Sequence, residues 1–135
     1  MFNSKISIVL REDLAVWQKL NVTAFLMSGI VGQDPAIIGK DYIDADNNRY
    51  NPMSVQPIII LKANAEKLRT IHQRALTRQI KVSAYIEEMF ATGHDEANRE
   101  VFSLHAPKDA NLVGIAIRAE KKLVDKVTKG AKMHD

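Results

Sequence analysis

The segment that most restricts the fold of this chain is PIIILKA at residues 57–63, in which four apolar residues follow a proline without interruption. A short apolar run bounded in this way is typical of a strand covered on both faces. Segments 5–11, 80–86 and 112–117 are also rich in β-branched or apolar residues and have the length of strands. We therefore expect a four-stranded mixed sheet covered by helices.

Helical periodicity fills the first long stretch between these strands. Asp13 is of a type that caps helices, and Gly29 or Gly32 is expected to end the helix that it begins. The predicted buried face of this helix consists of Trp17, Leu20, Ala24, Met27 and Val31, and it is widened by Val16, Phe25 and Leu26. We expect this helix to be deeply buried.

Two more helices follow the same logic. Asn64 is expected to cap the second, and the predicted inner face consists of Leu68, Ile71, His72, Ala75 and Leu76. On that face, His72 is interpreted as a packed core histidine. The last helix, within 119–130, should turn Leu123, Val124 and Val127 inward and end just before Gly130.

Two segments are less regular. Residues 34–56 contain two prolines and the turn-rich run DADNNRYN, so they form either a hairpin or a mobile flap. In 87–109, EEMFA is expected to form one helical turn, and a short helix should end at Pro107. The alternation of strands and helices predicts an α/β fold in which residues 1–135 form a single layered domain.

Composition excludes several classes of site. The chain has no cysteine, which excludes disulfides, thiolate metal sites and a cysteine nucleophile. The phosphate-binding and dinucleotide-binding glycine signatures and the zinc signature H-E-x-x-H are also missing. The longest stretch without a charge, residues 20–33, is shorter than the roughly 20 apolar residues of a membrane span. We expect a cytoplasmic protein with no membrane segment, metal or cofactor.

Two groups of charged residues could form a site. Carboxylates follow the strand at 80–86, where crevices of open α/β sheets lie, and His94 and His105 flank them. The other group is basic, since residues 118–132 hold six Lys or Arg and two acidic residues. For each group a solvated surface is the commoner explanation. The carboxylates are Glu87, Glu88, Asp95, Glu96 and Glu100.

The two ends of the chain resemble the archaeal and eukaryotic type of peptidyl-tRNA hydrolase. Arg11-Glu12-Asp13-Leu14, after the first strand, is similar to the V-V-R-x-D-L start of those enzymes. The strand VGIAI and the segment LVDKVTKGAK, at 113–132, are similar to their closing strand and D-K-V-T-G helix. The chain is similar to bacterial proteins of uncharacterised function related in fold to these hydrolases. The resemblance implies the type 2 hydrolase fold and a homodimer.

The resemblance also implies site residues. Lys19 stands at the place of a family lysine, whereas Phe25 and Ser28 stand where the family has a glutamine and a histidine. Glu88 and Thr92 bound a segment that matches Asp-Ala-Gly-x-Thr but lacks its glycine. Lys19, Glu88 and Thr92 are therefore the catalytic candidates, for positive charge, water orientation and a hydroxyl.

Three functions remain open. The first is the binding of a small anionic or nucleotide-like ligand at a cleft lined by the catalytic candidates and Ser28, with hydrolase activity lost together with the histidine. The second is a surviving hydrolase of peptidyl-tRNA or a related ester, with Lys19 and Glu88 central. The third is a homodimeric interaction protein that uses a sheet edge or an apolar helix face. Lys126 could add a ligand contact or a weak contact to RNA phosphates.

Overall fold

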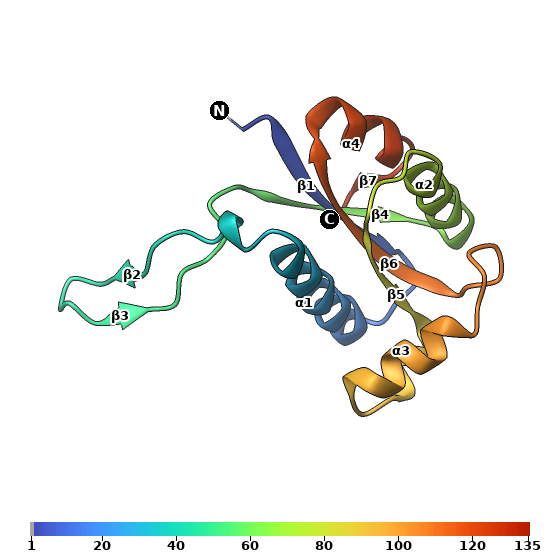
Figure 1. The fold of residues 1–135 in the computed structure, drawn as a ribbon, viewed down its shortest axis with the longest axis horizontal. Coiled ribbons are helices and arrows are strands. Elements are labelled where there is room, and N and C mark those ends of the chain that lie inside the picture. The colour runs from blue at the N-terminus through green and yellow to red at the C-terminus, as the bar shows by residue number, and fades with distance from the viewer. Residues whose placement is uncertain (1) are drawn as a thin grey trace.

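The computed structural model describes residues 2–135, which form one mixed α/β domain (Figure 1). The order of elements is β1 (Ser4–Arg11), α1 (Val16–Gln33), η1 (Pro35–Ile37), β2 (Tyr42–Ile43), β3 (Arg49–Tyr50), β4 (Ile58–Ala63), α2 (Ala65–Thr77), β5 (Ser83–Ile86), η2 (Glu87–Ala91), α3 (Asp95–Ser103), β6 (Leu112–Glu120), α4 (Lys121–Thr128) and β7 (Lys132–Met133), where η1 and η2 are 3₁₀ turns.

The main sheet has five strands in the order β5-β6-β1-β4-β7, not the four that the sequence predicts. Strand β1 pairs in parallel with β4 and antiparallel with β6, and β5 pairs antiparallel with β6. The extra strand, β7, pairs with β4 through Leu61–Met133 and Lys62–Lys132. Because β7 is only two residues long and exposed, it leaves no apolar run in the sequence.

Helices cover both faces of this sheet, as expected. On one face α2 and α4 enclose a core with Val9, Ile115 and Ile117 of the central strands. On the other face α1 packs on Ile6, Ile8 and Leu10. His72 is buried within α2, which confirms its interpretation as a core residue, and burial lowers its pKa.

The caps of α2 and α4 are as expected. Asn64 caps α2 by accepting a hydrogen bond of 2.7 Å from the backbone N–H of Lys67. Gly130 follows the C-cap of α4 and has a φ of +99°, a conformation that favours glycine.

The orientation predicted for α1 is wrong in part: Leu26 of the predicted face is buried and Met27 and Val31 are partly buried, but the rest of that face is not. Its buried row is Val22, Leu26 and Ile30, whereas Trp17 and Leu20 lie on the outside. Apolar residues surround the helix on all sides, so spacing alone selected the wrong row. The predicted ends are also wrong. The N-cap is Ala15 and the helix continues through both glycines to Gln33; Asp13 accepts from Arg11 at 2.6 Å instead.

Residues 39–55 form an arm that projects from the body beyond the C-terminal end of α1 (Figure 1). Its strands pair through Tyr42–Tyr50 and Ile43–Arg49, which confirms the hairpin among the two alternatives. At the tip, Asp44 accepts hydrogen bonds from the Tyr50 hydroxyl at 2.7 Å and from Asn48, and these bonds lower its pKa to about 2. Among residues 2–135, no helix is long and apolar enough to cross a membrane.

Candidate functional site

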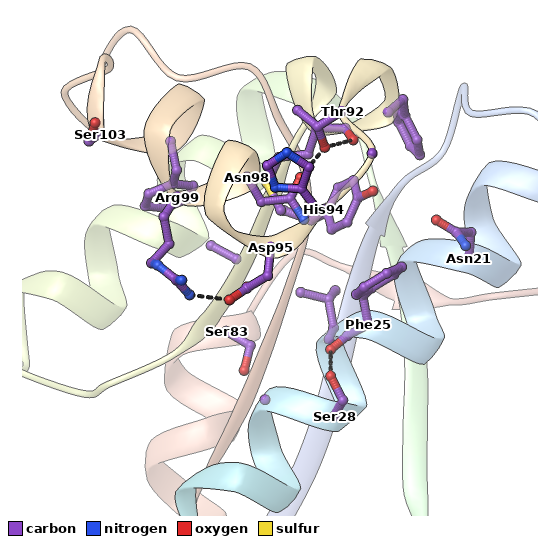
Figure 2. A pocket seen from close by; sticks show the side chains of 18 of the residues that line it. Asn21, Phe25, Ser28, Ser83, Thr92, His94, Asp95, Asn98, Arg99 and Ser103 are labelled. Carbon is purple, nitrogen blue, oxygen red and sulfur yellow. Dashed lines mark hydrogen bonds and ion pairs between the residues drawn. The ribbon is translucent and has the colours of Figure 1, made fainter.

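A cavity of about 860 Å³ lies between α1, the edge strand β5 and the segment that runs from η2 into α3 (Figure 2). Strand β5 has a neighbour in the sheet only on its β6 side, so its other edge is free to border this cavity. Phe25 and Ser28 approach the cavity from α1, and His94, Asp95 and Asn98 approach it from the opposite side. Cavities of this size suit small molecules.

Aromatic side chains form a continuous row along the cavity. The ring centroids of Trp17 and Phe90 lie 5.7 Å apart, those of Phe90 and Tyr85 5.2 Å, and those of Tyr85 and Phe25 5.8 Å. With Phe102, five of the eight aromatic residues of the chain (one Trp, three Tyr, four Phe) line this one cavity. Such a row offers flat apolar faces on which a flat ligand can stack.

Several polar groups surround the row. The His94 ring accepts from the backbone N–H of Ala97 through Nδ1 at 3.2 Å and caps α3, which leaves Nε2 as the N–H of the neutral ring. Burial raises the pKa of the Tyr85 hydroxyl, so it stays protonated at neutral pH. Ser28 already donates to the backbone carbonyl of Phe25 at 2.6 Å. Thr92 Oγ1 lies 2.9 Å from Met89 O and also contacts Asn98 Oδ1.

The cavity carries little net charge. Asp95 and Arg99, one turn apart on α3, form an ion pair with each other at its border (Figure 2). Both side chains are exposed, so the pair is weak and can open when a charged group arrives. The arrangement therefore suits a largely neutral ligand better than a multiply charged one.

The structure brings only two of the five predicted site residues together. Ser28 and Thr92 both line the cavity, from α1 and from the segment before α3. Lys19 lies on α1 but is not among the lining residues. Lys126 lies on α4, which packs with α2 against the opposite face of the sheet.

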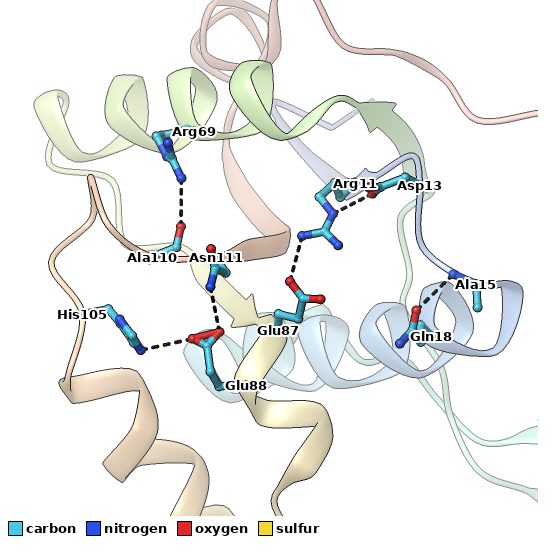
Figure 3. A network of polar contacts seen from close by, with 10 residues as sticks. All are labelled: Arg11, Asp13, Ala15, Gln18, Arg69, Glu87, Glu88, His105, Ala110 and Asn111. Atoms are coloured by element: carbon cyan, nitrogen blue, oxygen red, sulfur yellow. Dashed lines mark hydrogen bonds and ion pairs between the residues drawn. The ribbon is translucent and has the colours of Figure 1, made fainter.

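Glu88, the fifth, lies in a separate polar network at the carboxyl ends of β1 and β5 (Figure 3). Its carboxylate is 3.1 Å from His105 Nε2 and accepts from the Asn111 amide at 3.4 Å. The neighbouring Glu87 pairs with Arg11 at 3.3 Å. Of the five predicted carboxylates, Glu87 and Glu88 lie at the end of β5 as expected, and both have protein partners. The other three lie on α3. Among residues 2–135, no group of three or more metal-ligating side chains is suited to hold an ion.

Sequence reasoning missed the residues that dominate the cavity. The sequence predicts Trp17 on the buried face of α1 and Phe25 at the margin of that face, and it predicts no site role for Tyr85 or Phe90. The signal that could have found them is Met89-Phe90, two large apolar residues in the turn at 87–92, directly after two glutamates. Apolar residues in such a turn pack against something, and here they close the cavity.

Comparisons with known proteins place the chain in a family. Residues 4–135 match the family described as "Protein of unknown function (DUF2000)", so the chain belongs to it. A solved structure of a protein of unknown function from Agrobacterium tumefaciens strain C58 is 62% identical, covers 100% of both chains and has a TM-score of 0.99. No curated protein matches the chain.

Proposed function

We propose that this DUF2000 member binds a small nucleotide-like molecule in the cavity between α1, β5 and α3, without hydrolase activity. The observation that carries the proposal is the row of four aromatic rings from Trp17 to Phe25. Stacking a base on aromatic side chains contributes about 1–3 kcal/mol per base. The Tyr85 hydroxyl and the His94 Nε2 proton supply hydrogen bonds for the polar edge of a base.

The charge at the cavity border suggests how such a ligand is oriented. Arg99 is the one basic side chain among the lining residues that is charged at every physiological pH. A phosphate group can replace Asp95 as the partner of Arg99, but only at the exposed border of the cavity. We therefore place the base against the aromatic row and any phosphate at the mouth, with only a modest contribution from the phosphate.

The test uses Trp17, the only tryptophan of the chain, which lines the cavity. Adenosine and adenosine monophosphate are titrated while tryptophan emission is recorded, and thermal shift is measured in parallel. We expect saturable changes with both ligands and at least about fivefold weaker binding for Phe25→Ala, because one stacking surface is removed. Leu20→Ala, on the same helix but outside the cavity, is the matched control and should bind normally. No change in emission or melting with either ligand contradicts the proposal.

A second candidate function is hydrolysis of peptidyl-tRNA or a related ester, and the Glu88–His105 pair favours it. A histidine beside a carboxylate is a common general base, and it would stand in for the histidine that Ser28 replaces. However, neither residue lines the cavity. We expect no peptide release from labelled peptidyl-tRNA by the wild type. Release that His105→Gln or Lys19→Ala abolishes would replace the binding proposal with a hydrolase of the resembled type.

The resemblance to the hydrolases supports the remaining parts of the proposal. We infer a cytoplasmic, cofactor-independent protein with the type 2 hydrolase fold. Any RNA contact would use the basic α4 around Lys126, on the layer opposite the cavity. Such a contact should weaken steeply with salt, whereas adenosine binding should not, so the two are separable in one titration series.

A further inference from the structure

The outer surface of α1 is unusual for a helix at the surface of a protein. Lys19 is the single charged residue among its 18 residues. Val16, Trp17 and Leu20 are 73%, 61% and 68% exposed. Depletion of charge together with clustered large apolar side chains is the compositional mark of the centre of a protein interface. These three residues, with Ala24 one turn further on, are called the outer row of α1.

The arm, residues 39–55, presents a second apolar surface. Tyr42, Ile43, Tyr50, Met53 and Val55 are each between 51% and 57% exposed. All but Val55 line a hollow of about 350 Å³ on the arm itself, together with Asp44 and Asn51. A two-stranded hairpin without a core is marginally stable in water. The arm therefore has an apolar hollow, and a partner that covered this hollow would stabilise the hairpin.

We propose that the arm of one copy of this chain lies on the outer row of α1 of a second copy, reciprocally, about a two-fold axis. The two apolar surfaces belong to the same chain, and the arm points away from its own α1 (Figure 1). In a two-fold dimer the arm of each copy covers the outer row of the other, so neither apolar surface stays exposed. Side chains of the outer row, such as Leu20, fill the hollow of the partner's arm.

The available area is sufficient for a stable pair. The outer row supplies three large apolar side chains and the arm supplies five, and each of the eight is more than half exposed. Each therefore leaves on the order of 100 Å² open. A reciprocal pair would bury up to roughly 1,500 Å² of apolar surface, within the range of about 1,200–2,000 Å² for specific interfaces.

Charge does not oppose the contact. On the arm, Arg49 pairs with Asp41 at 3.5 Å. The Asp44 carboxylate is already bonded to Tyr50 and Asn48 within the hairpin. The other charged residues of the arm, Lys40 and Asp46, are exposed. The outer row itself carries no charge, so the arm can cover it with these two side chains kept in water.

The first test measures mass in solution by light scattering over a range of concentrations. We expect the wild type to be a dimer, and Leu20→Asp and Ile43→Asp to be monomers with unchanged circular dichroism. Leu104→Asp is the matched control, because Leu104 is 73% exposed against 68% for Leu20 but lies outside both surfaces, so this variant should remain a dimer. A monomeric wild type, or a dimer that persists in Leu20→Asp, overturns the proposal.

The second test identifies which surfaces meet. The chain has no cysteine, so introduced thiols are the only ones present. We expect oxidation to link Leu20→Cys chains with Ile43→Cys or Tyr42→Cys chains in a mixture, since a disulfide needs Cα atoms within about 7 Å. A disulfide between two Leu20→Cys chains would indicate that the two α1 helices pack on each other, and it overturns the arrangement. The absence of a disulfide in both mixtures overturns it as well.

Discussion

The two helical layers of this protein differ in how completely the chain itself covers them. In the α2–α4 layer Leu68, Ile71 and Ala75 of α2 are buried, and the outer face of the helix carries Glu66 and Arg69. Leu76, which is predicted on the inner face, is 39% exposed instead. Arg74 of α2 also donates to the backbone carbonyls of Val127 and Lys129, at 3.2 and 2.6 Å, and ties the two helices together. In the α1 layer one side packs on the sheet while the other exposes apolar side chains to water and borders the cavity. The first layer serves stability, and we place binding and assembly in the second.

The strongest test of this contrast compares two leucines. Leu68 in α2 is fully buried, whereas Leu20 in α1 is 68% exposed. Leu68→Ala should lower the free energy of unfolding by about 2–5 kcal/mol, through lost burial and an unfilled cavity. Leu20→Ala should change it by less than about 0.5 kcal/mol, as is usual for surface positions.

Urea unfolding gives both values and should be carried out at a protein concentration low enough for the chain to be monomeric, because dimerisation adds apparent stability. Similar losses in the two variants would mean that the outer row of α1 is part of the core of the monomer, and the contrast between the layers would fail.

The same contrast explains which parts of the fold the sequence predicts. In α2, charged residues mark the outer face, so spacing alone places Leu68 and Ile71 inward correctly. In α1 the outer face is also apolar, and a periodic pattern cannot distinguish a face covered by the sheet from a face left open. The strand β7 is missed for a different reason, because it depends on pairing with Leu61 and Lys62 and not on its own residues.

The contact between α1 and the sheet can be broken at Gly114 in β6. A Cβ atom at this position would lie 2.8 Å from Val22 Cγ1 and 3.0 Å from Leu26 Cδ1. Gly114→Val should therefore push α1 away from the sheet and cost about 1–3 kcal/mol of unfolding free energy. It should also weaken adenosine binding, because α1 forms one wall of the cavity.

Unfolding and adenosine titration of the same Gly114→Val sample measure both effects. Gly114→Ala adds a single methyl group and should give a smaller loss of the same sign. Full stability in Gly114→Val would contradict the close approach of α1 to β6.

The site is less predictable than the fold, for a physical reason. Trp17 and Phe25 come from α1, Tyr85 from β5 and Phe90 from η2, so the aromatic row exists only after these three elements pack. A resemblance based on the ends of the chain points to Lys19 and Glu88, which lie outside the cavity. Ser28 and Thr92 are the predicted residues that the packing brings to it.

Two glycines of α1 lie in different surroundings: Gly29 faces β5, whereas Gly32 faces open space. A Cβ at Gly29 would lie 2.3 Å from Ser83 Oγ and 3.1 Å from Ser83 Cβ, whereas a Cβ at Gly32 would meet nothing within 4 Å. Gly32→Ala should stabilise the fold by about 0.5–1 kcal/mol, because alanine loses less backbone entropy in a helix. Gly29→Ala should instead lower the free energy of unfolding, because the new methyl group collides with Ser83. A double variant that also carries Ser83→Ala should recover part of this loss. Thermal and urea unfolding measure the signs, and a stabilising Gly29→Ala would show that α1 does not press on β5.

The smallest expected effect lies in the arm, which packs on no core of its own chain. The Tyr50 hydroxyl, followed by Asn48, lowers the pKa of Asp44 from 3.8 to about 2. Because the folded pKa is lowered, the stabilisation of the hairpin is complete above pH 3.8 and is lost as the pH falls through about 2. Asp44→Asn and Tyr50→Phe should speed hydrogen exchange of the Asp46 and Asn48 amides, which donate to Asp44 Oδ1 at 2.9 and 3.0 Å.

The global unfolding midpoint of these arm variants should stay at the wild-type value when the chain is monomeric, because the hydrogen bonds of Asp44 stay within the tip of the arm. Asp41→Asn removes a neighbouring carboxylate that makes none of these bonds, and it should leave both amides protected. If Asp44→Asn instead lowered the unfolding midpoint of the monomer, the arm would be coupled to the body. The open layer would then extend from α1 into the hairpin as one cooperative unit.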